Sequence, residues 1–182
     1  TEYGGEFVRT YELSSHHRIR LAAQADTDGI PILSLDEVRI IAWLQGDGTV
    51  RPALEGGFDG AIYQSKPQHV ATLRALLSGV PHTESTRQRN PEYLPAVTFA
   101  LRRSFVSDLW KRAEIEDIGP EAFVLSLSPE QRSAWLGALI DAEGNRQIAG
   151  RQTKEHVRIT QVDGGLPDAI TLAVYLQGDR PS

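Results

Sequence analysis

Two stretches of this sequence carry the same pattern, IIAWLQGDG at residues 40–48 and LGALIDAEG at residues 136–144. Each is an apolar helical segment that ends in an acid followed by glycine, with Asp47 closing the first and Glu143 the second. A solvated acid before a C-cap glycine would explain either stretch alone. However, an acid at a helix C-terminus faces the negative end of the helix dipole, which disfavours it by up to about 1 kcal/mol. Because this placement occurs twice at equivalent positions, it indicates a compensating cation.

Small residues in both stretches predict that the two helices pack side by side on a pseudo-twofold axis. They are Ala42 and Gly46 in the first helix, and Gly137, Ala138 and Ala142 in the second. This packing would bring Asp47 and Glu143 together, where two bare carboxylates repel each other and raise each other's pKa. Mg²⁺ prefers oxygen ligands and would relieve that repulsion. Paired carboxylates that share metal ions are used for in-line phosphodiester hydrolysis.

The pattern of elements around these stretches also repeats, with an offset of about 96 residues. The sequence predicts helices over 34–45, 67–79, 104–113, 128–141 and 166–178, and strands within 7–23, 49–66, 83–89, 95–103 and 145–162. The first copy is αββαββα, and the second would need about 30 more residues to match it. We therefore expect an α+β fold with three parts: an N-terminal segment of strands and linker over 1–33, a first half over 34–127 and an incomplete second half over 128–182.

Composition limits the class of protein but does not identify its partner. The 182 residues include 40% hydrophobic and 24% charged residues and no cysteine, which excludes wholesale disorder, a disulfide framework and a thiolate metal site. No apolar run is long enough for a membrane helix, so we expect a cytoplasmic protein without a membrane partner. The net charge is −5, yet residues 49–112 carry nine basic and five acidic residues and 144–161 carry four and one. The predicted hairpins are therefore basic within an acidic chain.

At residues 40–48 and 136–144 the sequence resembles the LAGLIDADG homing endonucleases, in the two-motif form found in inteins. The resemblance covers about residues 34–178. It implies a site-specific endonuclease that hydrolyses double-stranded DNA, with Asp47 and Glu143 as catalytic acids that bind Mg²⁺ together with the carbonyl groups of Gly46 and Ala142. It also implies a monomer built as an internal pseudo-dimer, whose two antiparallel sheets form a saddle over the DNA major groove.

The same resemblance nominates hairpin residues as DNA contacts, since Arg and Lys favour guanine and Gln or Asn favours adenine. They are Arg51, Gln64, Lys66, Arg87, Arg89, Arg102, Arg146, Lys154, Arg158 and Gln161. Gln64 and Gln161 resemble a second-strand glutamine that helps position water in the family. The alternative for each basic residue is an ordinary solvated strand face.

Two features depart from the family and leave other functions open. The family usually carries a lysine ahead of the second motif, where this chain has Asp117, Ile118 and Gly119. Without that lysine, a decayed DNA-binding module is the rival to an active enzyme. The second departure is the incomplete second half.

The N-terminal region suggests an intein origin. SSHHR at residues 14–18 resembles an intein splicing block with His17 as its histidine, although two exposed histidines in a turn would look the same. The absence of methionine suits a piece excised from a longer host protein. A third reading is thus a passenger domain of a protein-splicing element.

Overall fold

A computed structural model describes residues 28–30, 32–88, 91–148, 155–159, 161 and 164–178. In this part of the chain the elements are α1 (Leu35–Gln45), β1 (Gly48–Pro52), β2 (Phe58–Gln64), α2 (Pro67–Leu76), β3 (His82–Arg87), β4 (Ala96–Leu101), α3 (Arg103–Ala113), α4 (Ile115–Ser126), α5 (Pro129–Glu143), β5 (Gly144–Ile148), β6 (Glu155–Ile159) and α6 (Gly165–Leu176). The α+β class predicted from the sequence is confirmed. The predicted strands over 7–23 lie outside the described residues.

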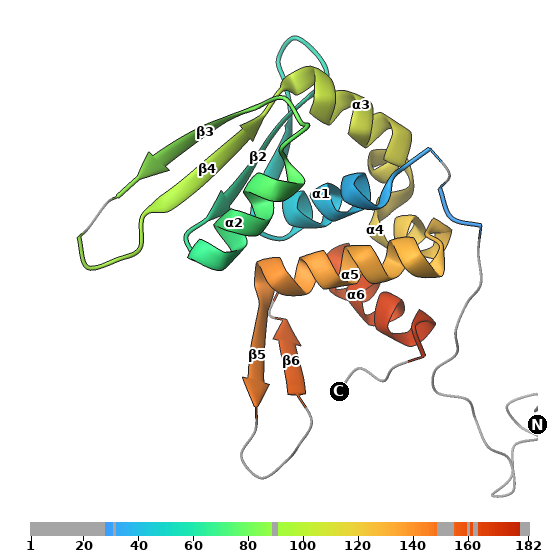
Figure 1. Cartoon of the computed structure of the whole chain (residues 1–182). Coiled ribbons are helices and arrows are strands. Elements are labelled where there is room, and N and C mark those ends of the chain that lie inside the picture. The colour runs from blue at the N-terminus through green and yellow to red at the C-terminus, as the bar shows by residue number, and fades with distance from the viewer. Residues whose placement is uncertain are drawn as a thin grey trace, which may run out of the picture.

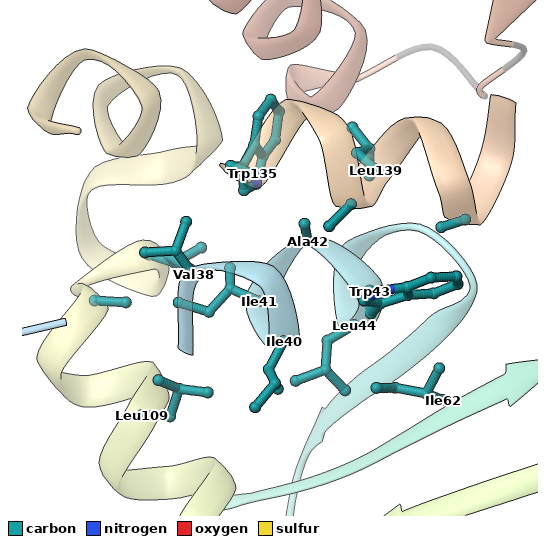
Figure 2. Close-up of a cluster of buried hydrophobic side chains, with 14 of the residues drawn as sticks. Val38, Ile40, Ile41, Ala42, Trp43, Leu44, Ile62, Leu109, Trp135 and Leu139 are labelled. Carbon is teal, nitrogen blue, oxygen red and sulfur yellow. The ribbon is translucent and has the colours of Figure 1, made fainter. Parts of the chain in front are cut away.

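Helix α1 lies at the centre of the molecule. Val38 and the five residues from Ile40 to Leu44 are buried, and only Arg39 interrupts this apolar run. One side packs along α5, through Ala42 facing Trp135 and Leu139, while Leu44 faces the first sheet near Ile62 (Figure 2). The two motif helices therefore lie side by side, as the repeat predicted (Figure 1).

Both motif helices begin with a serine cap. The Ser34 side chain accepts a hydrogen bond from the backbone N–H of Glu37, and Ser128 does the same for Gln131. Gln131 also binds the segment before α1, since its Nε2 donates to the carbonyl groups of Ile30 and Leu33 at 2.8 and 2.9 Å. This side chain thus joins the segment before α1 to the first turn of α5.

The strands form two antiparallel sheets. The first has the order β1-β2-β4-β3, and the second is the hairpin β5-β6. Their registers correspond, because Gly48 pairs with Ile62 immediately after the first motif and Gly144 pairs with Ile159 immediately after the second. The hairpin that follows each motif helix is therefore built in the same way.

The structure differs from the predictions at two places. The sequence predicts no helix or strand over residues 114–127, but α4 occupies most of them, in two pieces joined across Gly119, whose φ is 77°. Gly119 and Pro120 are breakers in the sequence, and here they mark a kink rather than a loop. Gly137 was predicted at the contact between the two motif helices, but a Cβ placed there would meet nothing within 4 Å. The close approach involves Gly46 instead.

No helix within the described part of the chain combines the length and hydropathy that a membrane span requires.

Candidate metal and nucleic-acid site

Asp47 and Glu143 lie at the adjoining C-terminal ends of α1 and α5. Gly46 makes this possible, because a Cβ there would lie 2.8 Å from Ala142 Cβ and 3.2 Å from Glu143 Cγ. Only a residue without a side chain lets the end of α1 come this close to α5. Further back, Trp135 Nε1 donates a hydrogen bond to Gln45 Oε1 at 2.7 Å and joins the same two helices. The helix pair therefore brings the two motif acids to one place.

Asp47 is held in position by the end of strand β2. Its backbone carbonyl accepts a hydrogen bond from the N–H of Tyr63 at 2.8 Å. Its Oδ2 accepts one from Gln64 Nε2 at 2.7 Å. The amide of Gln64 cannot turn around, because its Oε1 accepts from the backbone N–H groups of Ser65 and Lys66 at 2.9 and 3.0 Å. Gln64 thus presents a fixed donor to Asp47.

The charge state of Asp47 reflects this crowded position. Burial and the negative charge of Glu143 raise the pKa of Asp47 to about 6, against the smaller opposing effects of the Gln64 hydrogen bond and the Lys66 charge. An acid with a raised pKa beside a second acid is the arrangement that a cation stabilises. Lys66 is the cation that acts on Asp47, and its side chain is exposed.

The second half has a glutamine, Gln161, at the position that corresponds to Gln64. Gln64 follows Ile62 by two residues, and Gln161 follows Ile159 by two, while Ile62 and Ile159 each pair with the glycine after a motif acid. The Nε2 atom of Gln161 is buried and has no hydrogen-bond partner among the described residues. The repeat thus extends from the acids to the glutamines.

The donor set at the two acids suits a hard divalent cation. Carboxylates and backbone carbonyl groups are the oxygen ligands that Mg²⁺ and Ca²⁺ take. No group of three or more His, Cys, Asp or Glu side chains that could hold a metal occurs in the described residues. Two carboxylates alone leave ligand positions for water and for a substrate phosphate, as catalytic Mg²⁺ sites do.

The first sheet has one face against the helices and one without a helix. The register places Ile62, Gln64, Phe99 and Leu101 on the helix side, where all four are buried. Glu84 pairs with Phe99 on that side and forms an ion pair with Arg74 of α2. The opposite side, here called the outer face, consists of the alternate strand residues, which are Thr49, Arg51, Asp59, Ala61, Tyr63, Thr83, Ser85, Arg87, Ala96, Thr98 and Ala100.

The structure separates the residues nominated for DNA contact. Arg51 and Arg87 are exposed on the outer face. Lys66 and Arg102 are exposed directly after β2 and β4, at the N-caps of α2 and α3. Gln64, in contrast, is 5% exposed and hydrogen-bonded at both amide atoms, so here it orients Asp47 instead of facing a ligand.

The nominated residues of the second half are described less completely. Arg158 is exposed on β6 and pairs with Asn145, and Arg146 of β5 pairs with Val157. Arg89, Lys154 and His17 lie outside the described residues.

The cations nearest in sequence to the missing family lysine are not at the acids. Arg112 binds Glu37, Asp108 and the carbonyl group of Ile32, near the start of α1. Lys111 lines a cavity of about 260 Å³ with Phe58 and other residues. Phe58 begins β2 and Gln64 ends it, which places this cavity about 20 Å along the strand from the Gln64–Asp47 hydrogen bond.

The sequence pointed to the two acids but not to the side chains that hold them in place. The Gln45–Trp135 hydrogen bond joins residues 90 positions apart, and no local pattern signals it. The Gln64–Asp47 bond has a partial signal, since the glutamine recurs at the end of each hairpin.

No protein-family model matches the sequence, and no curated protein matches it. Solved structures do. A variant of I-DmoI with its target DNA in the presence of Mg superposes with a TM-score of 0.51 and 13% identity, over 80% of this chain and 79% of that chain. I-DmoI with DNA and Mn gives a TM-score of 0.49 at 14% identity, with the same two coverages. Mesophilic variants of the homing endonuclease I-DmoI give a TM-score of 0.49 at 14% identity, over 80% of this chain and 78% of that chain. At this identity the likeness shows the fold, and it agrees with the fold expected from the LAGLIDADG resemblance.

Proposed function

We propose that this chain is a divalent-metal-dependent endonuclease domain that cleaves double-stranded DNA. One observation carries the proposal: two acids from equivalent motifs lie at adjoining helix ends, where burial and mutual repulsion raise the pKa of Asp47 to about 6. A structural role would favour an acid that is solvated or paired with a cation. The solved structures with this fold support the proposal, since I-DmoI is described with its target DNA and Mg.

Mg²⁺ is the metal we propose, held by Asp47 and Glu143 with the carbonyl groups of Gly46 and Ala142. When bound, it supplies Lewis-acid stabilisation of the phosphate and a more acidic water. Gln64 fixes the direction of the Asp47 carboxylate through a donor that is itself held by two backbone N–H groups. Lys66 offers an exposed positive charge to the phosphate backbone beside the acids. Gln161 has the corresponding position to Gln64 in the second half.

The proposed DNA contacts are the exposed cations around the two hairpins. Arg51, Lys66, Arg87 and Arg102 belong to the first half and Arg158 to the second. The charge of the outer face supports the choice of Arg51 and Arg87. Asp59 is the only acid among the described strand positions of this face, and it forms an ion pair with Arg103, with 2.8 Å between Oδ1 and Nε. A strand face with cations and a neutralised acid complements the DNA backbone.

The proposal also covers the organisation of the chain. We place the boundary between the two halves at 127/128, because a new motif helix begins at Ser128 and repeats the α1-β1-β2 register. We place the domain in an intein on the grounds of its motif type and the SSHHR stretch. Reading the parent chain for a leading Cys or Ser and a terminal Asn would test that placement.

Replacing the acids separates binding from cleavage. Asp47→Asn should lower the cleavage rate by more than about a hundredfold. Loss of a residue that only supports a metal ligand lowers activity by at most about that factor, and Asp47 is proposed as a ligand itself. The amide keeps an oxygen for the Gln64 hydrogen bond but is a poor Mg²⁺ ligand. DNA affinity should stay the same or rise, because a charge that repels phosphate is removed. Glu143→Gln should behave in the same way.

The assay is cleavage and binding of a randomised duplex library by the protein, with Mg²⁺, with Mn²⁺ and with chelator, followed by sequencing of the new ends. Asp28→Asn is the matched control, since Asp28 is exposed before α1. If the unmodified protein binds a defined duplex but never cuts it with either metal, the chain is a decayed DNA-binding module, as the missing lysine at 117–119 would suggest. If Asp47→Asn cuts at the original rate, the metal role is wrong.

A further inference from the structure

On the outer face of the first sheet, the type of side chain changes from row to row along the strands. The register places Thr49, Ala61, Ala100 and Thr83 in one row across the four strands, and Tyr63, Thr98 and Ser85 in the next row. These seven residues, here called the hydroxyl–methyl band, carry no charge and no amide. Five of them offer a hydroxyl group, and the two alanines offer only a methyl group.

The guanidinium groups of this face lie beyond the band on both sides. Arg51 follows Thr49 by two residues along β1, away from Asp47. Arg87 follows Ser85 by two residues along β3, which runs in the opposite direction to β4 and ends on the Asp47 side of the sheet. Both arginines are exposed, and no ion pair or hydrogen bond from either is recorded within the described residues.

The guanidinium groups and the hydroxyl and methyl groups of the band recognise different bases in the major groove of DNA. Arginine forms a bidentate pair with guanine O6 and N7, while Ser and Thr hydroxyl groups accept either base type and methyl groups contact the methyl of thymine. Six of the seven side chains in the band are short, and these let the sheet lie close to base edges, while Tyr63 is the one large side chain and carries its hydroxyl group outward. Larger, charged residues would hold it away.

We infer that the first sheet recognises a DNA half-site with two guanine positions, one under Arg51 and one under Arg87, separated by a thymine-rich segment under the hydroxyl–methyl band. The inference rests on the proposed function, and it names the class of sequence that this face takes. From the Arg51 row to the Arg87 row there are three steps of two residues. Measured along the strand direction, at about 3.4 Å per residue, this is about 20 Å, the length of roughly six base pairs. The two arginines also stand on opposite edge strands, β1 and β3, so the guanines they contact lie at opposite borders of the sheet.

The experiment is selection of duplexes from a randomised library by the 182-residue chain in chelator, so that bound DNA stays intact, followed by sequencing. The expected pool has two enriched guanines about six base pairs apart, with thymine and adenine enriched between them. Arg51→Ala and Arg87→Ala should each remove the preference at one guanine, by about five- to a hundred-fold, and leave the other unchanged. Thr98→Arg should create a new guanine preference inside the segment.

Arg39→Ala is the matched control, because Arg39 is an exposed arginine of α1 that pairs with Asp36. It should leave every base preference unchanged. A pool with guanine enriched between the two positions, or unchanged guanine preferences in both arginine variants, would overturn this inference while leaving the endonuclease proposal in place. A library from which no duplex is enriched at any salt concentration would overturn the proposed function and this inference with it.

Discussion

Asp47 combines interactions that oppose each other. Its backbone and one carboxylate oxygen are held by Tyr63 and Gln64, which favours a single orientation of the side chain. Its charge is opposed by burial and by Glu143, and favoured less strongly by the Gln64 hydrogen bond and by Lys66. A residue held in place but electrostatically disfavoured is typical of a functional site.

The raised pKa of Asp47 makes stability depend on pH in a defined direction. The folded state binds the proton more tightly than the unfolded state, in which an aspartate has a pKa of about 4. The stabilising contribution is therefore complete below pH 4 and is lost as pH rises to about 6. Asp47→Asn should remove this slope and stabilise the metal-free protein at pH 8 by on the order of 1 kcal/mol, after discounting for solvent screening of a partly exposed group.

Thermal unfolding at pH 5 and pH 8, with and without Mg²⁺, measures this effect. Mg²⁺ should stabilise the unmodified protein more at pH 8, because the metal requires the ionised carboxylate. Asp28→Asn should retain the original pH dependence. An Asp47→Asn protein less stable than the original at pH 8 without metal would show that the acids are not in electrostatic conflict.

At the scale of elements, the contact between α1 and α5 depends on one glycine and not on another. Gly46 lies against Ala142 and Glu143, whereas Gly137 faces open space from inside α5. Two glycines in equivalent-looking motifs therefore have opposite energetic roles. The first permits a close approach, and the second only weakens a helix.

Alanine substitutions should separate these roles. Gly46→Ala should destabilise the fold by about 1–3 kcal/mol, because its Cβ would overlap Ala142. Gly137→Ala should stabilise it by about 0.5–1 kcal/mol, through the better helix propensity of alanine. Urea unfolding of both variants measures the two changes. Destabilisation by Gly137→Ala would place that residue at a contact after all.

At the scale of the whole molecule, the proposed DNA binding requires a local basic surface on an acidic chain. The net charge is −5, so we expect the attraction to come from the two basic segments 49–112 and 144–161, which include Lys66 and the exposed arginines. DNA affinity should therefore fall steeply as salt increases.

Lys66→Gln should weaken binding about equally for all duplexes and reduce the slope of log affinity against log salt concentration by about one. Lys111→Gln is the matched control, since Lys111 lines the cavity at the far end of β2 and should leave the slope unchanged. Titrations of a fluorescent duplex at several salt concentrations measure both. Equal slopes for Lys66→Gln and the original protein would remove Lys66 from the DNA interface.

Interactions between residues near in sequence could be predicted without the structure. The Ser34 and Ser128 caps act over three residues, within one local stretch of sequence. The repeated motif and its small residues predicted the pairing of α1 and α5, and this pairing is confirmed.

Only the tertiary structure decided which side chains meet and which way they face. The Gln64–Asp47 and Gln45–Trp135 hydrogen bonds depend on distances across the fold, and Gly46 rather than Gly137 allows the helices to approach. Strand register put Gln64 inside and Arg51 outside, although both were nominated for the same role. The sequence alone determined a pair of motif helices ending in acids, because that pattern is local and repeated. The support of the acids and the chemistry of the outer face required the fold, because pairing of strands brings together residues that are far apart in the chain.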